Sequence, residues 1–201
     1  MNLTLALLAL LALLPVFVLI AVLIRLTSRG AVFYLQERVG LDRRLPGPGP
    51  HNHRRAHDLG GRPFTIYKFR TMRVDAEQLS GAVWAQQQDP RVTPLGRVLR
   101  QYRLDELPQL LNVLRGEMSL VGPRPERPEF VELFRQDIVR YGDRHRVKSG
   151  ITGWAQVHGL RGQTSLAERV EWDNYYIANW SLGLDLKILA MTLIALFRNA
   201  E

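Results

Sequence analysis

Two adjacent carboxylates, Asp105 and Glu106, lie where an arginine-rich segment meets a short apolar run. Asp105 has the residue type of a helix N-cap, and Glu106 and Pro108 would then fall in the first turn. A capped helix is the ordinary interpretation of such a pair. The chemical interpretation is that a carboxylate at a phosphate-binding helix N-terminus acts as a nucleophile while its neighbour holds a hard cation.

Basic residues occur on both sides of the acidic pair in the sequence. They are Lys68 and Arg70 in a segment of strand composition, Arg97, Arg100 and Arg103 before the pair, and Arg124 after it. A two-residue period puts Lys68 and Arg70 on one strand face. A three-residue step puts Arg97 and Arg100 on one helix face. Such residues are ordinarily a solvated surface. The arginines that precede the acidic pair could instead form a cluster that neutralises a diphosphate.

Arg124 differs from the other basic residues because prolines enclose it. Pro123 and Pro125 fix their own φ angles, and Pro125 also biases Arg124 toward an extended conformation. The guanidinium would therefore be held out from a stiff segment. Between this segment and the acidic pair, leucines at helical spacing over residues 107–114 predict a short helix that faces a core, and Gly116 supplies its C-terminal stop.

Periodicity and capping predict further elements. Residues 64–70 form a predicted strand, and residues 126–141 form a predicted amphipathic helix. Ser165 and Glu168 make a capping box that opens another helix. The apolar run 188–197 is too short to span a bilayer, so we expect it to pack on the domain or lie at a membrane interface. Two polar connections complete the pattern, at residues 43–61 and 76–88.

An uncharged run of 22 residues extends from Leu3 to Ile24. As a helix it is long enough to cross a bilayer. It does not fit a cleaved signal peptide, because no cation precedes it and no small-residue cleavage site follows it. Arg25 and Arg29 come next and place that end in the cytoplasm. Pro15 interrupts the run. The helix is then either a kinked single-pass anchor, which span length favours, or a helix that breaks and re-enters the same leaflet.

The chain carries a formal net charge of +8 and contains no cysteine. The positive charge favours anionic partners such as phosphate-rich substrates, an anionic membrane surface or nucleic acid. The lack of cysteine excludes a disulfide framework and a zinc–thiolate site. Charge and anchor alone would equally suit a non-catalytic, membrane-anchored basic protein that binds anionic lipid or nucleic acid. That alternative gives no reason for an acidic pair to follow an arginine cluster.

These motifs closely resemble those of the bacterial sugar transferases, the monotopic phosphoglycosyl transferases that act on polyprenyl phosphate. The resemblance is carried by Lys68–Met72, Leu104–Leu110, Asn112–Leu114, Met118–Pro125 and the stretches 147–159 and 179–187. It covers nearly the whole chain. Leu14 departs from the family pattern, in which serine commonly precedes the proline of the anchor. His158 also departs, since asparagine is common at that position.

The resemblance implies an α+β, mostly helical fold. Residues 1–30 would form a re-entrant membrane helix-break-helix with its break at Pro15. Residues 31–201 would form a cytoplasmic catalytic domain on the membrane surface, with a short β-hairpin. The implied location is the bacterial inner membrane. The implied partners are a UDP-sugar, undecaprenyl phosphate and membrane lipid, without nucleic acid, and a homodimer is compatible with the family.

The implied reaction transfers a sugar 1-phosphate from a UDP-sugar to undecaprenyl phosphate and releases UMP. Residues 150–159 and 179–187 resemble those of glucose- or galactose-phosphate transferases. The reaction would initiate exopolysaccharide, capsule, O-antigen or related glycan synthesis. By resemblance, Asp105 is the nucleophile that carries the phosphosugar and Glu106 holds Mg²⁺. The expected substrate-binding residues are Lys68, Arg70, Arg97, Arg100, Pro123, Arg124 and Pro125.

Overall fold

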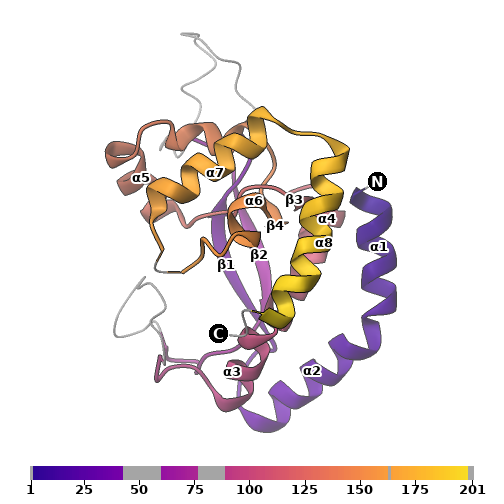
Figure 1. Ribbon diagram of the computed structural model, residues 1–201. Helices are drawn as coiled ribbons and strands as arrows, with labels where there is room; N and C mark the ends of the chain where they lie inside the picture. The colour runs from indigo at the N-terminus through magenta and orange to yellow at the C-terminus, as the bar shows by residue number, and fades with distance from the viewer. Residues whose placement is uncertain (1, 43–59, 77–88, 163, 199–201) are drawn as a thin grey trace.

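The computed structural model describes residues 2–42, 60–76, 89–162 and 164–198. The predicted polar connections at 43–61 and 76–88 lie almost wholly outside the described residues. The fold is α+β with helices predominating, as the resemblance implied. Figure 1 shows a two-stranded ribbon running lengthwise through the molecule. Helices α5 (Pro128–Asp137) and α7 (Leu166–Ala178) lie toward one end, and α3 (Pro94–Gln101) lies toward the other.

The ribbon is an antiparallel pair of strands. β1 (Phe33–Val39) pairs with β2 (Pro63–Phe69), with Phe33 opposite Phe69 and Val39 opposite Pro63. The hairpin prediction is confirmed, and the predicted strand begins and ends one residue earlier than expected. On β2, Ile66 and Phe69 are buried in two separate apolar clusters, so this strand packs against two parts of the core.

A second, parallel pair joins β3 (Ser119–Val121) to β4 (Gly150–Thr152). A Cβ added at Gly150 would lie only 2.1 Å from the backbone nitrogen of Gly122, so glycine is what lets the two chains approach. β4 is followed by the one-turn helix α6 (Trp154–Val157). Three-residue strands carry too few side chains to show a two-residue period.

The N-terminal apolar run forms two helices, α1 (Asn2–Ala12) and α2 (Leu14–Thr27), bent by 58° at a break beside Pro15. The proline has no N–H to donate to the preceding turn, which accounts for a break at this point. No single helix among the described residues is long and apolar enough to cross a membrane, whereas the bent pair passes that test by length and composition together. The predicted break is confirmed.

The anchor pair packs on the domain through only one side. Ala6 of α1 is fully buried against Leu110 and Val113, and Phe17 of α2 meets Phe69 with ring centroids 5.4 Å apart. Much of the remaining surface is exposed and apolar. The leucines and valines with the largest exposure on the pair are Leu3, Leu8, Leu11, Leu14, Val18, Leu19 and Leu26. An apolar surface of this extent is typical of contact with lipid or a protein partner.

The predicted leucine helix is not one continuous α-helix. It is divided into the 3₁₀ helix η2 (Leu104–Gln109) and the α-helix α4 (Leu110–Leu114). Leu110 is buried, while the other leucines of the pattern are partly buried. Gly116 follows with φ of +73°, a left-handed conformation that glycine adopts readily, which confirms the predicted stop.

The C-terminal half contains α5, the 3₁₀ helix η3 (Tyr141–Arg146), α7 and α8 (Leu182–Arg198). The predicted helix 126–141 is too long, because α5 begins at Pro128 and ends at Asp137. The Ser165 hydroxyl accepts a hydrogen bond from the Glu168 N–H, which confirms the predicted cap of α7. The apolar run 188–197 belongs to α8, which packs on the domain through the fully buried Ile188.

Candidate active site

The acidic pair lies in the wall of a cavity of about 670 Å³. η2 carries both carboxylates and packs against β2. Asp105 and Glu106 each expose only 8% of their surface. The cavity is also lined from β1, from the segment around Arg124 and from the loop before α7. Motifs that are far apart in the sequence therefore meet around the acidic pair.

Asp105 is not the helix N-cap that the sequence suggested. η2 begins at Leu104, and the residue that precedes it, Arg103, has a left-handed backbone with φ 56° and ψ 21°. The Glu106 N–H donates to the Arg103 carbonyl at 3.2 Å, as the tight turns of a 3₁₀ helix require. Asp105 thus lies inside a six-residue 3₁₀ helix, and the expected phosphate site at an α-helix N-terminus is absent from this described segment.

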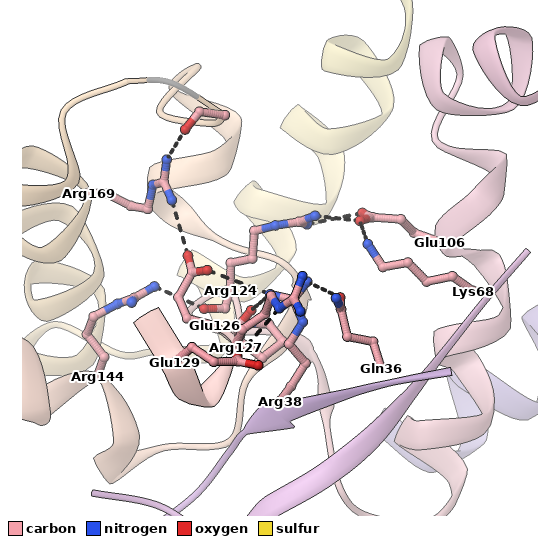
Figure 2. A network of polar contacts seen from close by, with 12 residues as sticks. Gln36, Arg38, Lys68, Glu106, Arg124, Glu126, Arg127, Glu129, Arg144 and Arg169 are labelled. Carbon is pink, nitrogen blue, oxygen red and sulfur yellow. Dashed lines mark hydrogen bonds and ion pairs between the residues drawn. The ribbon is translucent and has the colours of Figure 1, made fainter. Parts of the chain in front are cut away.

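Glu106 is held by two cations. Its Oε1 accepts hydrogen bonds from Lys68 Nζ at 2.7 Å and from Arg124 Nη2 at 2.6 Å, and its Oε2 accepts one from Arg124 Nη1 at 3.2 Å (Figure 2). Burial opposes ionisation of Glu106, but Arg124 and Lys68 outweigh it and hold the pKa of this carboxyl well below its usual range. Glu106 is therefore an ionised carboxylate fixed in one orientation.

Asp105 has the opposite environment. Among the described residues, nothing donates a hydrogen bond or forms an ion pair with its carboxylate. Burial and the adjacent Glu106 charge raise the pKa of Asp105 to about 6, although Lys68, Arg100 and Arg124 act in the other direction. One buried carboxylate is thus tied down while its neighbour is left unpaired beside the cavity. A carboxylate in that state is suited to nucleophilic attack.

The predicted basic residues divide into those that reach the acidic pair and those that do not. Lys68 and Arg124 contact Glu106 directly. Arg100 lines the cavity and donates Nε to Thr71 Oγ1 at 2.9 Å. Arg97 is exposed and does not line the cavity. A three-residue step still rotates a side chain by about 60°, which is enough to separate these two arginines.

Arg70 contacts the anchor rather than the acidic pair. Its Nη1 donates to the Arg29 carbonyl at 2.6 Å, and its Nη2 donates to the Ser28 carbonyl at 3.1 Å and to Ser28 Oγ at 2.7 Å. These acceptors come directly after α2. Arg70 also lines the cavity, but its Nη1 and Nη2 donate to the residues that follow the anchor, while its Nε is buried without a hydrogen-bond partner in the described part of the chain. Its observed contacts link the membrane element to the strand that carries Lys68.

The proline-enclosed segment lies between β3 and α5, outside any helix or strand, and two further arginines hold it. Arg144 donates Nη2 to the Arg124 carbonyl at 3.0 Å, and Arg38 donates Nη1 to the Pro125 carbonyl at 3.1 Å (Figure 2). Arg144 is in turn paired with the buried Asp173 at 2.8 Å. The backbone on either side of the Arg124 side chain is therefore fixed from η3 and from β1, which orients its guanidinium toward Glu106.

Glu126 is a buried residue that the sequence reasoning missed. The sequence predicts that Glu126 begins an amphipathic helix. In the structure Glu126 precedes α5 and exposes only 6% of its surface. Its carboxylate accepts from Arg169 Nη1 at 3.2 Å and lies 3.7 Å from Arg38 Nη1. The signal in the sequence was Pro128, which marks the first turn of the helix and leaves Glu126 outside it.

Arg161 is a second residue that the sequence reasoning missed. It lies in the loop before α7 and lines the cavity. Its Nε and Nη1 are buried without a hydrogen-bond partner in the described part of the chain. Buried donors of a guanidinium are rarely left unpaired, so this end of the cavity is short of anionic or polar acceptors. A bound substrate would supply them.

Asp105 and Glu106 supply only part of the ligand set that a hard cation such as Mg²⁺ requires. Asp105 offers an unpaired carboxylate and Glu106 an ionised one, which are ligands that Mg²⁺ accepts. No group of three or more histidine, cysteine, aspartate or glutamate side chains within residues 2–42, 60–76, 89–162 and 164–198 could hold a metal ion. Mg²⁺ commonly keeps one or two carboxylates and completes its shell with water and substrate phosphates. The pair fits that mode of binding and not an all-protein cage.

Comparison with known proteins identifies the family. A family model described as "Bacterial sugar transferase" matches residues 1–199. The chain belongs to the bacterial sugar transferase family. The matched residues include the bent anchor pair, the strand with Lys68, the acidic pair and the segment around Arg124.

Curated relatives have names that specify substrates. An "Undecaprenyl-phosphate glucose phosphotransferase" of Komagataeibacter xylinus is 43% identical over 96% of this chain and 34% of the relative. A "UDP-glucose:undecaprenyl-phosphate glucose-1-phosphate transferase" of Escherichia coli (strain K12) is 43% identical over 98% of this chain and 39% of the relative. A "UDP-N-acetylgalactosamine-undecaprenyl-phosphate N-acetylgalactosaminephosphotransferase" of Aeromonas hydrophila is 46% identical over 89% and 38%. This chain therefore spans somewhat over a third of the length of these relatives.

Proposed function

We propose that this bacterial sugar transferase moves a sugar 1-phosphate from a UDP-sugar to undecaprenyl phosphate and releases UMP. The observation that carries the proposal is the difference between two neighbouring carboxylates. Asp105 is buried and unpaired, whereas Glu106 is fixed by Lys68 and Arg124. Relatives named for this reaction match nearly the whole chain, which supports the same assignment.

In the first half-reaction, a carboxylate oxygen of Asp105 attacks the sugar-bearing phosphorus of the UDP-sugar. The bond from that phosphorus to the bridging oxygen breaks, and UMP leaves with the electron pair. The phosphosugar is then esterified to Asp105. Lys68, Arg100 and Arg124 offset the negative charge that would otherwise repel a carboxylate from a diphosphate. The proline segment presents Arg124 to the nucleotide side of the diphosphate.

In the second half-reaction, a phosphate oxygen of undecaprenyl phosphate attacks the same phosphorus. The bond to Asp105 breaks and the carboxylate is regenerated. The product is a sugar linked to the lipid through a diphosphate. Dividing the transfer in two lets two anionic substrates use one cavity in turn, so their charges never have to be accommodated together.

Mg²⁺ would be held by Glu106 and, before it reacts, by Asp105, with phosphate oxygens and water as further ligands. When bound, the ion supplies Lewis-acid stabilisation of the charge on the diphosphate. Arg124 and Lys68 hold the pKa of Glu106 well below its usual range, which favours the ionised form that can serve as a ligand. Its orientation is fixed before any substrate arrives, which limits the reorganisation that binding requires.

The lipid acceptor explains the anchor. We place residues 1–30 in one leaflet as a re-entrant helix-break-helix, with Arg25 and Arg29 at the cytoplasmic headgroups of the inner membrane and residues 31–201 on that surface. The bend of 58° is compatible with this re-entrant path and with the kinked single-pass alternative, and the family resemblance favours the re-entrant path. The stretches 150–159 and 179–187 favour glucose or galactose as the sugar, and an N-acetylated sugar, as in the name of the Aeromonas hydrophila relative, is the alternative. The product would begin an exopolysaccharide, capsule, O-antigen or related glycan.

The test is UMP release by the detergent-solubilised protein with undecaprenyl phosphate, Mg²⁺ and a panel of UDP-sugars. We expect release with one or few sugars, loss on chelation, and loss in Asp105→Asn with the fold intact. The control is Asp137→Asn, a change at the end of α5 outside the cavity. Turnover near the wild-type level in Asp105→Asn would disprove the nucleophile. Salt-sensitive binding of any polyanion without chemistry would favour the anionic-lipid or nucleic-acid binding protein instead.

A further inference from the structure

Arg103 has an unusual backbone at a decisive position. Among the described residues, only Arg103 and Arg140 are non-glycine residues with positive φ, at 56° and 61°. The left-handed conformation is unfavourable for arginine. Glycine adopts it readily, and among the other residues mainly Asn and Asp do so. Such strain persists where surrounding structure enforces it, and it concentrates at functional sites. Arg103 ends the turn after α3 and lies two residues before Asp105.

The side chain of Arg103 is directed to the cavity and has no partner. It lines the cavity together with Asp105 and Glu106. No hydrogen bond or ion pair of its guanidinium occurs within the part of the chain that the structure describes. Its nitrogens are also not among the buried side-chain atoms that lack a hydrogen-bond partner. Lys68 and Arg124, by contrast, are already engaged by Glu106. Arg103 therefore brings a positive charge to the cavity that the protein itself leaves available.

Arg103 lies toward the anchor end of the cavity. It directly follows α3, which packs against α2. That end of the cavity is lined by Ala31, Phe33 and Val74, and the last two are 42% and 65% exposed. The other end is lined by Phe130, Arg161 and Arg169. A substrate that carries both a hydrocarbon chain and a phosphate would match an apolar rim and a guanidinium that line the same cavity, whereas a nucleotide would not need the rim.

We infer that Arg103 binds the phosphate of the polyprenyl phosphate acceptor and positions it for attack on the phosphosugar carried by Asp105. The inference rests on the proposed function and adds a residue and an acceptor subsite to it. In this step a phosphate oxygen of the lipid forms the new bond to phosphorus, and the Asp105–phosphorus bond breaks. The guanidinium transfers no proton. It contributes charge and two parallel N–H donors, which suit a phosphate.

The chain offers a matched pair of variants. Arg103→Gly removes the guanidinium while glycine keeps the left-handed backbone. Arg140→Gly makes the same change at the other left-handed arginine, whose side chain is paired with Asp143 and 65% exposed, and which does not line the cavity. Exchange of labelled UMP into UDP-sugar without lipid reports the first half-reaction alone. Sugar phosphate transfer to undecaprenyl phosphate reports both.

For Arg103→Gly we expect kcat/KM for undecaprenyl phosphate to fall about 10- to 100-fold, with UMP exchange within about threefold of wild type. Arg140→Gly should leave both activities within about threefold of wild type. Arg103→Lys should recover part of the loss because it restores the charge without the paired donors. Equal losses in exchange and transfer would instead assign Arg103 to the nucleotide substrate, and no loss in either would remove it from the site.

A binding measurement keeps this inference separate from the reaction. Undecaprenyl phosphate should raise the thermal midpoint of wild-type protein and of Arg140→Gly in detergent, but not that of Arg103→Gly, while UMP should raise all three. Absence of UMP exchange in the wild type would count against the proposed function and leave this comparison intact. An equal effect of inorganic phosphate and the lipid would overturn the lipid as the ligand.

Discussion

Arg124 places Nη2 2.6 Å from Oε1 of Glu106, although the two residues come from the proline segment after β3 and from η2. A second hydrogen bond joins Nη1 to Oε2 at 3.2 Å, so the contact is a two-pronged one between a planar cation and a carboxylate. This contact also separates the roles of the two neighbouring carboxylates, because Glu106 is paired with two cationic side chains and Asp105 is not.

Lysine cannot reproduce that contact. We expect Arg124→Lys to lower kcat about 10- to 100-fold, because one charge remains but the paired donors are lost. The exposed Arg97 provides the control, and Arg97→Lys should keep turnover within about twofold of wild type. The measurement is UMP release at saturating UDP-sugar. Equal rates for the two variants would show that the geometry at Glu106 does not matter.

The pKa of Asp105 predicts the acid limb of the first half-reaction. Attack requires the carboxylate form, and the pKa of Asp105 is raised to about 6. The rate of a single turnover without lipid should therefore fall about tenfold per pH unit below about 6 and level off above 7. The donor diphosphate does not change charge in this range, whereas phosphate monoesters titrate near pH 6, so lipid must be left out. A rate that is flat between pH 5 and 7 would contradict the assignment.

The same pKa predicts that Asp105 lowers the stability of the protein. The folded-state pKa of about 6 lies above the ordinary value of 3.8, so ionisation of Asp105 disfavours the folded state. The penalty is absent below about pH 4, grows as pH rises to about 6, and stays constant above that. Asp105→Asn should therefore be more stable than wild type at pH 7.5, by about 1–3 kcal/mol.

Thermal unfolding in detergent at pH 4 and pH 7.5 checks this expectation. The advantage of Asp105→Asn over wild type should be near zero at the acid pH and appear at the higher pH. A variant that is less stable than wild type at pH 7.5 would mean that the Asp105 carboxylate is stabilised by its surroundings, and the nucleophile would then lack its unpaired state.

Local sequence signals predicted much of the catalytic region. The resemblance of Lys68–Met72 to a family motif correctly placed Lys68 beside the acidic pair. Gly116 and Ser165 correctly marked helix ends. These features depend on neighbours in the chain, which is why composition and spacing reveal them.

Features that depend on tertiary contact were not predictable in this way. Arg70 shares a strand period with Lys68, but its Nη1 and Nη2 donate to Ser28 and Arg29, which directly follow α2. β3 and β4 are too short to show a period and pair only because glycine permits close approach. Arg103 has a left-handed backbone that no residue preference suggests. Each was decided by packing between segments distant in the sequence.

Glu126 provides the last test, because it is buried between two arginines. Its carboxylate contacts Arg169 at 3.2 Å and Arg38 at 3.7 Å, and the side chains of all three expose 14% or less. Glu126→Gln should lower the free energy of unfolding by about 3–5 kcal/mol, because it leaves two buried guanidinium groups without their counter-charge. Glu129 is the matched control. It forms a surface pair with Arg127 at 3.5 Å, and its side chain is 58% exposed.

Glu129→Gln should therefore change stability by less than about 1 kcal/mol. Chemical denaturation of both variants in detergent, followed by tryptophan fluorescence, provides the comparison. The order of the two effects follows from burial, since solvent replaces the lost charge at Glu129 but cannot reach Arg169. A small change in the free energy of unfolding of Glu126→Gln, together with a fall in UMP release, would contradict this expectation. It would indicate that Glu126 and its arginines contribute to substrate binding and not to stability.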